Sequence, residues 1–276
     1  MSERHTLPGR GWTVDLVRVG SGAPLVWLHG AFGLEWSMPL VEALARHHTV
    51  IAPHLPGYGA SDGLDDIDSF YDLSVWLDDV LDVVGIDRVM LAGHDFGGAA
   101  AAEYAALFRR RTQLLAALAP LGLWLDEAPL PDIFGLTPGA LTRVLFADAQ
   151  SEAAAAFNSQ SHDKAERNAA ILRRRQALIA AAKLLWPLPD KGLKKRLHRI
   201  AAPTLLVWGA QDRITGSAYA SAFSALVVGA STATVPAGHM MPLEAPAQTA
   251  DVVRAFAAKA SGARHSSGAP ARSAGS

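Results

Sequence analysis

The sequence contains no cysteine among its 276 residues. This absence excludes a disulfide-stabilised scaffold, a metal site with cysteine ligands and a cysteine nucleophile. Charged residues are also few, at 18%, and the formal net charge is −1 at pH 7. A chain with so little net charge is not expected to bind nucleic acid through bulk positive charge. If the chain carries a nucleophile, we therefore expect it to be an oxygen atom.

Long hydrophobic runs are missing as well. No run reaches the roughly 18 apolar residues of a transmembrane helix, so no membrane-spanning segment is expected. Residues 1–10 are polar and lack the apolar segment of a secretory signal. We therefore expect a cytoplasmic protein that acts on a small-molecule substrate, with neither nucleic acid nor a membrane as partner. Both a monomer and a homodimer stay open.

Half of the residues are hydrophobic, which is enough to bury a large core. Short apolar segments, typical of strands buried on both faces, alternate with segments of helical periodicity. This alternation predicts an α/β fold with a mostly parallel central sheet flanked by helices. The expected strands lie at residues 12–19, 24–28, 49–52, 89–92, 114–119, 204–208 and 232–235. The expected helices lie at residues 36–45, 71–84, 96–108, 217–227 and 247–258.

The alternation stops between about residues 123 and 199. Prolines punctuate helical segments there, the longest at about 163–186, and no strand-like segment occurs. We therefore predict an α/β core, residues 1–122 and 200–260, into which residues 123–199 are inserted as a helical cap. Residues 261–276 are rich in serine, glycine and alanine and are predicted to be disordered.

Residues 89–100 have the pattern of a nucleophile elbow, a tight turn between a strand and a helix. An apolar strand leads into Gly93-His94-Asp95-Phe96-Gly97, and an alanine-rich helix follows. The glycines allow the central residue to adopt a strained conformation at the helix N-terminus. Free N–H groups at that helix end favour negative charge, so they stabilise a carboxylate at position 95. Taken alone, the segment is also compatible with an ordinary glycine-rich turn.

Two later residues have the positions of an acid and a base. Asp212 follows a late strand, where its carboxylate can orient an imidazole, and His239 lies in a loop before the final helix. The order nucleophile, acid, histidine is the chain order of α/β-hydrolases. We therefore predict Asp95 as nucleophile, Asp212 as acid and His239 as base. Asp126 and Glu127, which follow an earlier strand, stand at the alternative position for the acid.

An oxyanion hole and a substrate pocket are expected beside these residues. The loop at residues 29–33 follows a buried strand, where one oxyanion-hole donor is expected, so the backbone N–H groups of Ala31 and Phe96 are the predicted donors. With residues 53–62 as a further landmark, the chain resembles the α/β-hydrolase fold superfamily from about residue 12 to 259. This resemblance implies a hydrolase that needs neither a metal nor an organic cofactor. The predicted pocket residues are His29, Phe32, His94, Trp124, Trp186 and Met240.

Asp95 stands where most α/β-hydrolases carry serine. A carboxylate that attacks an ester or amide gives a mixed anhydride, whereas attack on a saturated carbon bearing a halide or an epoxide oxygen gives a stable alkyl ester. Water activated by His239 then hydrolyses that ester. The elbow at residues 93–97 is similar to that of epoxide hydrolases and haloalkane dehalogenases. This similarity implies a small, largely apolar substrate of the epoxide or alkyl halide class.

The chain departs from both groups where the leaving group is stabilised. No tyrosine occurs in the predicted cap, and Phe96, Ala31 and Gly33 replace residues usual in one group or the other. Residues 119–124 and 238–246 are equally similar to esterases and carbon–carbon bond hydrolases, which use serine. Three hypotheses stay open: a covalent Asp95 nucleophile, a derived enzyme in which Asp95 is a base or acts in a non-hydrolytic reaction, and a binding protein without turnover.

Overall fold

A single mixed sheet forms the centre of the protein, whose computed structural model describes residues 2–188 and 190–267. Within these residues eight strands lie in the order β1-β2-β4-β3-β5-β6-β7-β8. β1 and β2 pair antiparallel, as do β2 and β4, and all other neighbours are parallel. The predicted mostly parallel sheet is therefore confirmed. The strands are β1 (Ser2–Thr6), β2 (Thr13–Val19), β3 (Ala23–Leu28), β4 (His48–Pro53), β5 (Val89–His94), β6 (Thr112–Leu118), β7 (Thr204–Gly209) and β8 (Ser231–Val235).

Burial separates β5 and β7, which apolar segments predict, from β1, which no apolar segment predicts. Every residue of β5 and β7 is buried, as expected for short apolar segments covered on both faces. By contrast, β1 is a polar edge strand that alternates between exposed and half-buried residues, so no apolar pattern predicts it. It forms through pairing with β2, where Arg18 Nε donates to Glu3 Oε1 at 2.9 Å.

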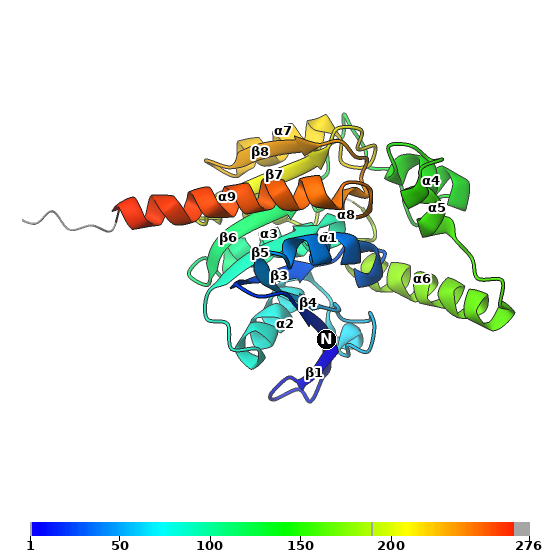
Figure 1. Ribbon diagram of the computed structural model, residues 1–276, viewed down its shortest axis with the longest axis horizontal. Coiled ribbons are helices and arrows are strands. Elements are labelled where there is room, and N and C mark those ends of the chain that lie inside the picture. Colours follow the sequence, from blue (N-terminus) through cyan, green and yellow to red (C-terminus); the bar gives the residue numbers. More distant parts are fainter. Residues whose placement is uncertain (1, 189, 268–276) are drawn as a thin grey trace, which may run out of the picture.

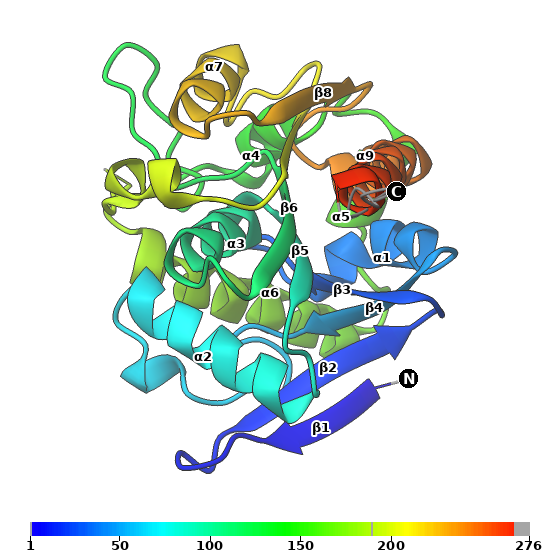
Figure 2. The same ribbon diagram turned by 90° about the vertical axis from the view of Figure 1, so that its left-hand side faces the viewer.

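Helices cover both faces of the sheet (Figure 2). One face carries α1 (Met38–Leu44) and α9 (Pro246–Ser267), which pack against each other. The other carries α2 (Phe70–Val83), α3 (Asp95–Leu107) and, over β7, α7 (Ser217–Leu226). Residues 95–106 of α3 are all buried. Because most of their side chains are small, this helix lies directly on the central strands and fixes the position of its N-terminus.

The chain between β6 and β7 contains α4 (Pro138–Leu145), α5 (Glu152–Asn158) and α6 (Lys164–Leu185) and, in its described residues, no strand. The sequence predicts the helical cap in this segment. These helices lie beyond one end of the sheet, opposite the end from which α9 projects (Figure 1). α6 begins as the sequence predicts, because the Asp163 side chain accepts the Glu166 N–H at 2.8 Å and caps the helix.

The C-terminal part of the chain differs from the prediction of disorder from residue 261. α9 continues to Ser267, because adding residues to a helix already anchored by packing costs little. The remainder of the predicted disordered tail, residues 268–276, lies outside the described residues. None of the helices described here combines the length and apolar character needed to cross a membrane.

Candidate active site

Asp95 occupies a strained turn between β5 and α3. Its φ of 56° lies in the left-handed region, which residues other than glycine rarely adopt. Glycines make the turn possible: a side chain at Gly93 would clash with the Gly97 carbonyl, and one at Gly97 would clash with the Leu28 carbonyl. The turn is therefore held by close backbone contacts, both within itself and with the end of β3.

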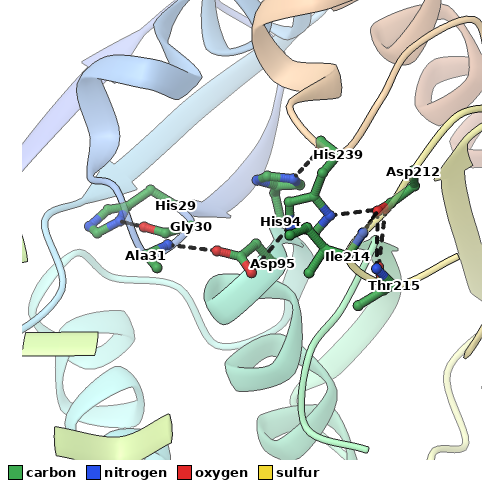
Figure 3. Close-up of polar contacts among 9 residues, drawn as sticks. All are labelled: His29, Gly30, Ala31, His94, Asp95, Asp212, Ile214, Thr215 and His239. Carbon is green, nitrogen blue, oxygen red and sulfur yellow. Dashed lines mark hydrogen bonds and ion pairs between the residues drawn. The ribbon is translucent and has the colours of Figure 1, made fainter. Parts of the chain in front are cut away.

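The loop after β3 contacts the Asp95 carboxylate from one side. The Ala31 N–H donates a hydrogen bond to Asp95 Oδ2 at 2.8 Å (Figure 3). A side chain at Gly30 would approach the same oxygen to 3.0 Å, so glycine leaves room for the carboxylate. Phe96 is the second residue of α3, and the first N–H groups of a helix have no partner within it.

His239 lies between the two carboxylates (Figure 3). Its Nδ1 is 2.9 Å from Asp212 Oδ2, and its Nε2 is 3.3 Å from Asp95 Oδ1. Asp95 and His239 are each only 2% exposed. The structure therefore brings together, in a buried position, the three side chains that the sequence predicts as the catalytic triad.

Asp212 is itself held by the turn that follows β7. Its Oδ1 accepts the N–H groups of Ile214 and Thr215 at 2.8 and 3.0 Å, and its Oδ2 also accepts the Thr215 hydroxyl at 3.1 Å. These bonds fix the carboxylate, so the proton on His239 Nδ1 faces Asp212 and Nε2 faces Asp95.

The two carboxylates control the protonation of His239. Burial alone would lower the pKa of His239, but Asp212 and Asp95 outweigh it and raise the pKa to about 10. Burial would raise the pKa of each carboxyl, yet the His239 imidazolium holds both pKa values below their ordinary range. In the resting protein a positive imidazole therefore lies between two negative carboxylates.

Two further histidines, predicted as pocket residues, hold the loops of the site. His94 Nε2 is 2.8 Å from the His239 carbonyl oxygen, and burial lowers the pKa of His94 to about 4. His29 Nε2 accepts the Leu55 N–H at 3.1 Å, so its Nδ1 donates to the Gly30 carbonyl at 2.8 Å. Burial lowers the pKa of His29 to about 3. Both rings are buried and uncharged near neutral pH, with these nitrogens bonded to the backbone.

Tyr58 connects the same loop to the cap, a role that the sequence did not reveal. Its hydroxyl lies 3.0 Å from the Ala31 carbonyl oxygen and 2.8 Å from the Ala177 carbonyl oxygen of α6. Burial raises the pKa of Tyr58 well above its ordinary value, so the hydroxyl keeps its proton. The segment 53–62 marks this region in the sequence, but no local pattern identifies the bonding partners.

Phe32 and Met240, also predicted as pocket residues, are each 3% exposed. The Phe32 ring packs edge-on against Phe157 of α5, with ring centres 5.3 Å apart, and the Arg174 guanidinium of α6 lies 4.1 Å from the centre of the Phe157 ring. Phe32 thus lies where the loop after β3 meets α5 and α6.

Among the residues that the structure describes, neither of the two predicted tryptophans makes a hydrogen bond to the Asp95 carboxylate. The Trp124 indole N–H donates to Asp126 Oδ1 at 2.9 Å. Trp186 is 53% exposed, and its nearest aromatic neighbour is Phe134, at 6.2 Å between ring centres. Asp126, the alternative acid, is exposed and bonds to Trp124, while His239 pairs with Asp212. Sequence composition does not reveal these directions, because a tryptophan in a cap can pack on either side.

Comparisons with known proteins bear on the fold and the family of the chain. Residues 25–252 match the model of a family described as the alpha/beta hydrolase family. The chain is 34% identical over 128 residues to the 2-hydroxy-6-oxo-2,4-heptadienoate hydrolase of Pseudomonas putida, a match that covers 44% of this chain and 45% of that protein. It is 39% identical over 106 residues to the soluble epoxide hydrolase of Corynebacterium sp., covering 37% of this chain and 36% of that protein.

The matches therefore span less than half of these curated relatives. Among solved structures, the fold is similar to the meta-cleavage product hydrolase CumD of Pseudomonas fluorescens IP01, with a TM-score of 0.74 and 18% identity. That match covers 94% of this chain and 98% of the other. At this level of identity the structural similarity shows a shared fold alone.

Proposed function

The chain belongs to the alpha/beta hydrolase family, and on this premise we propose that Asp95 attacks a saturated carbon of a small, largely apolar substrate. One observation carries the proposal. A buried carboxylate stands at the elbow, with one oxygen bonded to the Ala31 N–H and the other facing His239. An ionised carboxylate needs no general base to attack, so the imidazole stays available for the second step.

In the first step Asp95 Oδ1 forms a bond to the substrate carbon. The bond between that carbon and the leaving group breaks, and the leaving group takes the electron pair. Oδ2 becomes the carbonyl oxygen of the resulting alkyl ester and keeps its hydrogen bond from the Ala31 N–H. The low pKa of Asp95 ensures that the carboxylate is ionised over the whole neutral range.

In the second step water attacks the carbonyl carbon of the ester and gives a proton to His239 Nε2. The negative charge develops on Oδ2, where the N–H groups of Ala31 and Phe96 stabilise it. The bond from this carbon to Oδ1 then breaks, and the alcohol departs with Oδ1 and the proton that His239 holds. The second proton of the water, left on the new carboxyl of Asp95, passes to His239 Nε2. Asp95 is regenerated with one oxygen from water.

The charges of the site favour this order of steps. Ester formation removes the negative charge of Asp95, which is one of the two charges that raise the pKa of His239. Burial and the loss of that charge both then lower the pKa of His239, so the imidazolium can release its proton to water and then act as a base. The first step therefore prepares the base for the second.

The tyrosines of the chain bear on the leaving group. An epoxide oxygen leaves as an alkoxide and needs a proton donor, whereas a halide leaves as a stable anion. The hydroxyls of Tyr58, Tyr104 and Tyr219 lie within hydrogen-bonding distance of protein oxygen atoms, and Tyr71 lies half-exposed on α2. His239 contacts the attacking carboxylate, whereas an in-line displacement puts the leaving atom on the far side of the carbon. Alkyl halides are therefore favoured over epoxides.

The same electrostatics disfavour the two other hypotheses. A general base works best when its pKa lies near the working pH, but the His239 imidazolium lowers the pKa of Asp95. A protein that only binds a ligand has no need of an imidazole oriented by Asp212.

Single turnover in ¹⁸O-labelled water tests the proposal, with enzyme in excess over an alkyl halide or epoxide. The label is expected in the Asp95 peptide and not in the product alcohol. In His239→Gln, intact mass is expected to show an alkyl adduct on Asp95 that persists, while the exposed control His198→Gln shows none. Label that enters the product directly, or ester turnover that survives Asp95→Ala, contradicts the nucleophile assignment.

A further inference from the structure

The C-terminal end of α4 lies against the loops that carry Asp212 and His239. We name residues 143–147 the α4 end; it comprises the last turn of α4 and the two residues that follow. The Met240 N–H donates to the Leu145 carbonyl at 3.0 Å. We name residues 236–240, which follow β8 and include His239, the histidine loop. Because Met240 follows His239 directly, this bond ties the histidine loop to a helix inserted between β6 and β7.

Glu244 joins the same two segments with its carboxylate. Oε2 accepts the Gly238 N–H at 2.8 Å, and Oε1 accepts the Ala147 N–H at 2.7 Å. Gly238 precedes His239, so one half-buried side chain holds both the histidine loop and the α4 end.

Arg213 makes the equivalent connection from the residue after Asp212. Its Nη1 donates to the carbonyls of Arg143 and Phe146 at 2.9 and 2.7 Å, and its Nη2 donates to the Ala147 carbonyl at 3.3 Å. Carbonyls at a helix C-terminus lack partners within the helix, so the guanidinium satisfies groups that are otherwise unpaired.

Gly238 allows the direct approach of the two backbones. A side chain there would lie 2.5 Å from the Ala147 nitrogen and 2.7 Å from the Phe146 carbonyl carbon. Real Cβ atoms do not come so close to backbone atoms, so at Gly238 the backbone packs directly against the backbone of the α4 end.

We propose that the α4 end positions the Asp212–His239 pair, with Glu244 and Arg213 as the positioning residues. α4 and the acid–base pair then move as one unit, so a substrate that displaces α4 also displaces the imidazole. The catalytic consequence rests on the proposed function, in which only hydrolysis of the Asp95 ester uses His239 as a base. Glu244 and Arg213 touch neither substrate nor reacting atoms and act through the backbone.

Hydrogen exchange measured by mass spectrometry tests the coupling without any substrate. In Glu244→Gln, peptides covering residues 143–147 and 236–241 are expected to lose protection together, by about tenfold, because bonds to a charged acceptor are lost. Peptides from β5 and α3 are expected to stay protected. Glu42→Gln, a control at an exposed glutamate of α1, is expected to leave the exchange of every peptide at the rate of the unmodified protein. Faster exchange in only one of the two segments, or in neither, overturns the coupling.

Arg213→Gln provides a second variant if Glu244→Gln fails to fold, because Arg213 is exposed and its loss leaves the core intact. It is expected to speed hydrogen exchange in the same two peptides. Kinetics complete the test: both variants are expected to form the Asp95 adduct within about twofold of the unmodified rate and to hydrolyse it about tenfold more slowly. Adduct hydrolysis at the unmodified rate in both variants overturns the positioning role. If no substrate yields an adduct, the proposed function fails, and hydrogen exchange still decides the coupling.

Discussion

The end of the sheet around Asp95 and the outer face of α6 are built on different principles. Around Asp95, close backbone contacts and hydrogen bonds fix almost every group, and the side chains of Asp95 and His239 are buried. On α6, Leu172 and Ile179 are exposed at 57% and 66%, and the helix contacts the core at a few points, such as the Tyr58 hydroxyl. A substitution should therefore be severe in the first region and mild in the second.

Asp212→Asn should give the largest effect, and it tests the hydrogen bonds that hold the region around Asp95. An amide cannot stabilise the imidazolium, and it favours the wrong tautomer of His239. Hydrolysis of the Asp95 ester is expected to slow by about 10³-fold or more. The decay of the adduct followed by mass spectrometry measures this. Asp126→Asn, the matched control at the alternative acid, should stay within about twofold, and a larger effect there would reassign the acid.

Gly97→Ala tests the close backbone contacts that hold the region around Asp95. The new side chain would clash with the Leu28 carbonyl, so the free energy of unfolding should fall by about 3 kcal/mol. Gly139→Ala in α4 has no atom closer than 3.8 Å to the new carbon and should instead gain about 0.5 kcal/mol. Chemical denaturation compares the two, and equal losses would show that the cap is as tightly built as the core.

The pH dependence of the reaction rates should distinguish formation of the Asp95 adduct from its hydrolysis. The base form of His239 is the deprotonated one, so adduct hydrolysis should rise about tenfold per pH unit until pH passes the pKa of His239 in the alkyl-enzyme. Adduct formation needs only ionised Asp95, whose pKa is lowered, and should change by less than about twofold between about pH 6 and pH 9. Rapid-quench mass spectrometry measures both rates. If formation rises in parallel with hydrolysis, the nucleophile needs a base.

Trp186→Ala should give the smallest effect. Its side chain is half-exposed, and its aromatic neighbour is Phe134, so the free energy of unfolding should change by about 0.5 kcal/mol or less. Adduct formation should stay within about twofold of the unmodified rate. A large loss of that rate would place the indole at the leaving group after all and would weaken the contrast between cap and core.

The sequence predicted best where local pattern and backbone geometry coincide. Gly93 and Gly97 are required by the turn itself, and buried strands such as β5 are continuous apolar segments. The positions of Asp212 and His239 follow from the same logic, because parallel strands carry the residues that follow them to one edge of the sheet. Residues that depend on such short-range rules can be identified without a structure.

The rest depends on contacts between distant segments, for which no local pattern exists. Glu244 bonds to Ala147, nearly a hundred positions away, and Tyr58 reaches Ala177. Neither bond has a signal in the residues around it. The half-exposed position of Trp186, which the sequence predicts as a pocket residue, has a related cause. Composition favours burial of tryptophan, but it does not say on which side of the inserted segment the core lies.

The contacts that hold the elbow have one more consequence. Gly93 and Gly97 meet backbone atoms, and no atom of the Asp95 side chain takes part in those contacts. The backbone contacts at Gly93 and Gly97 therefore do not depend on whether a carboxylate or a hydroxyl stands at position 95, whereas Gly30 and Ala31 contact the side chain itself. A chain of this design can exchange its reactive group by a single substitution and keep its shape, so chemistry at this position can diverge faster than architecture.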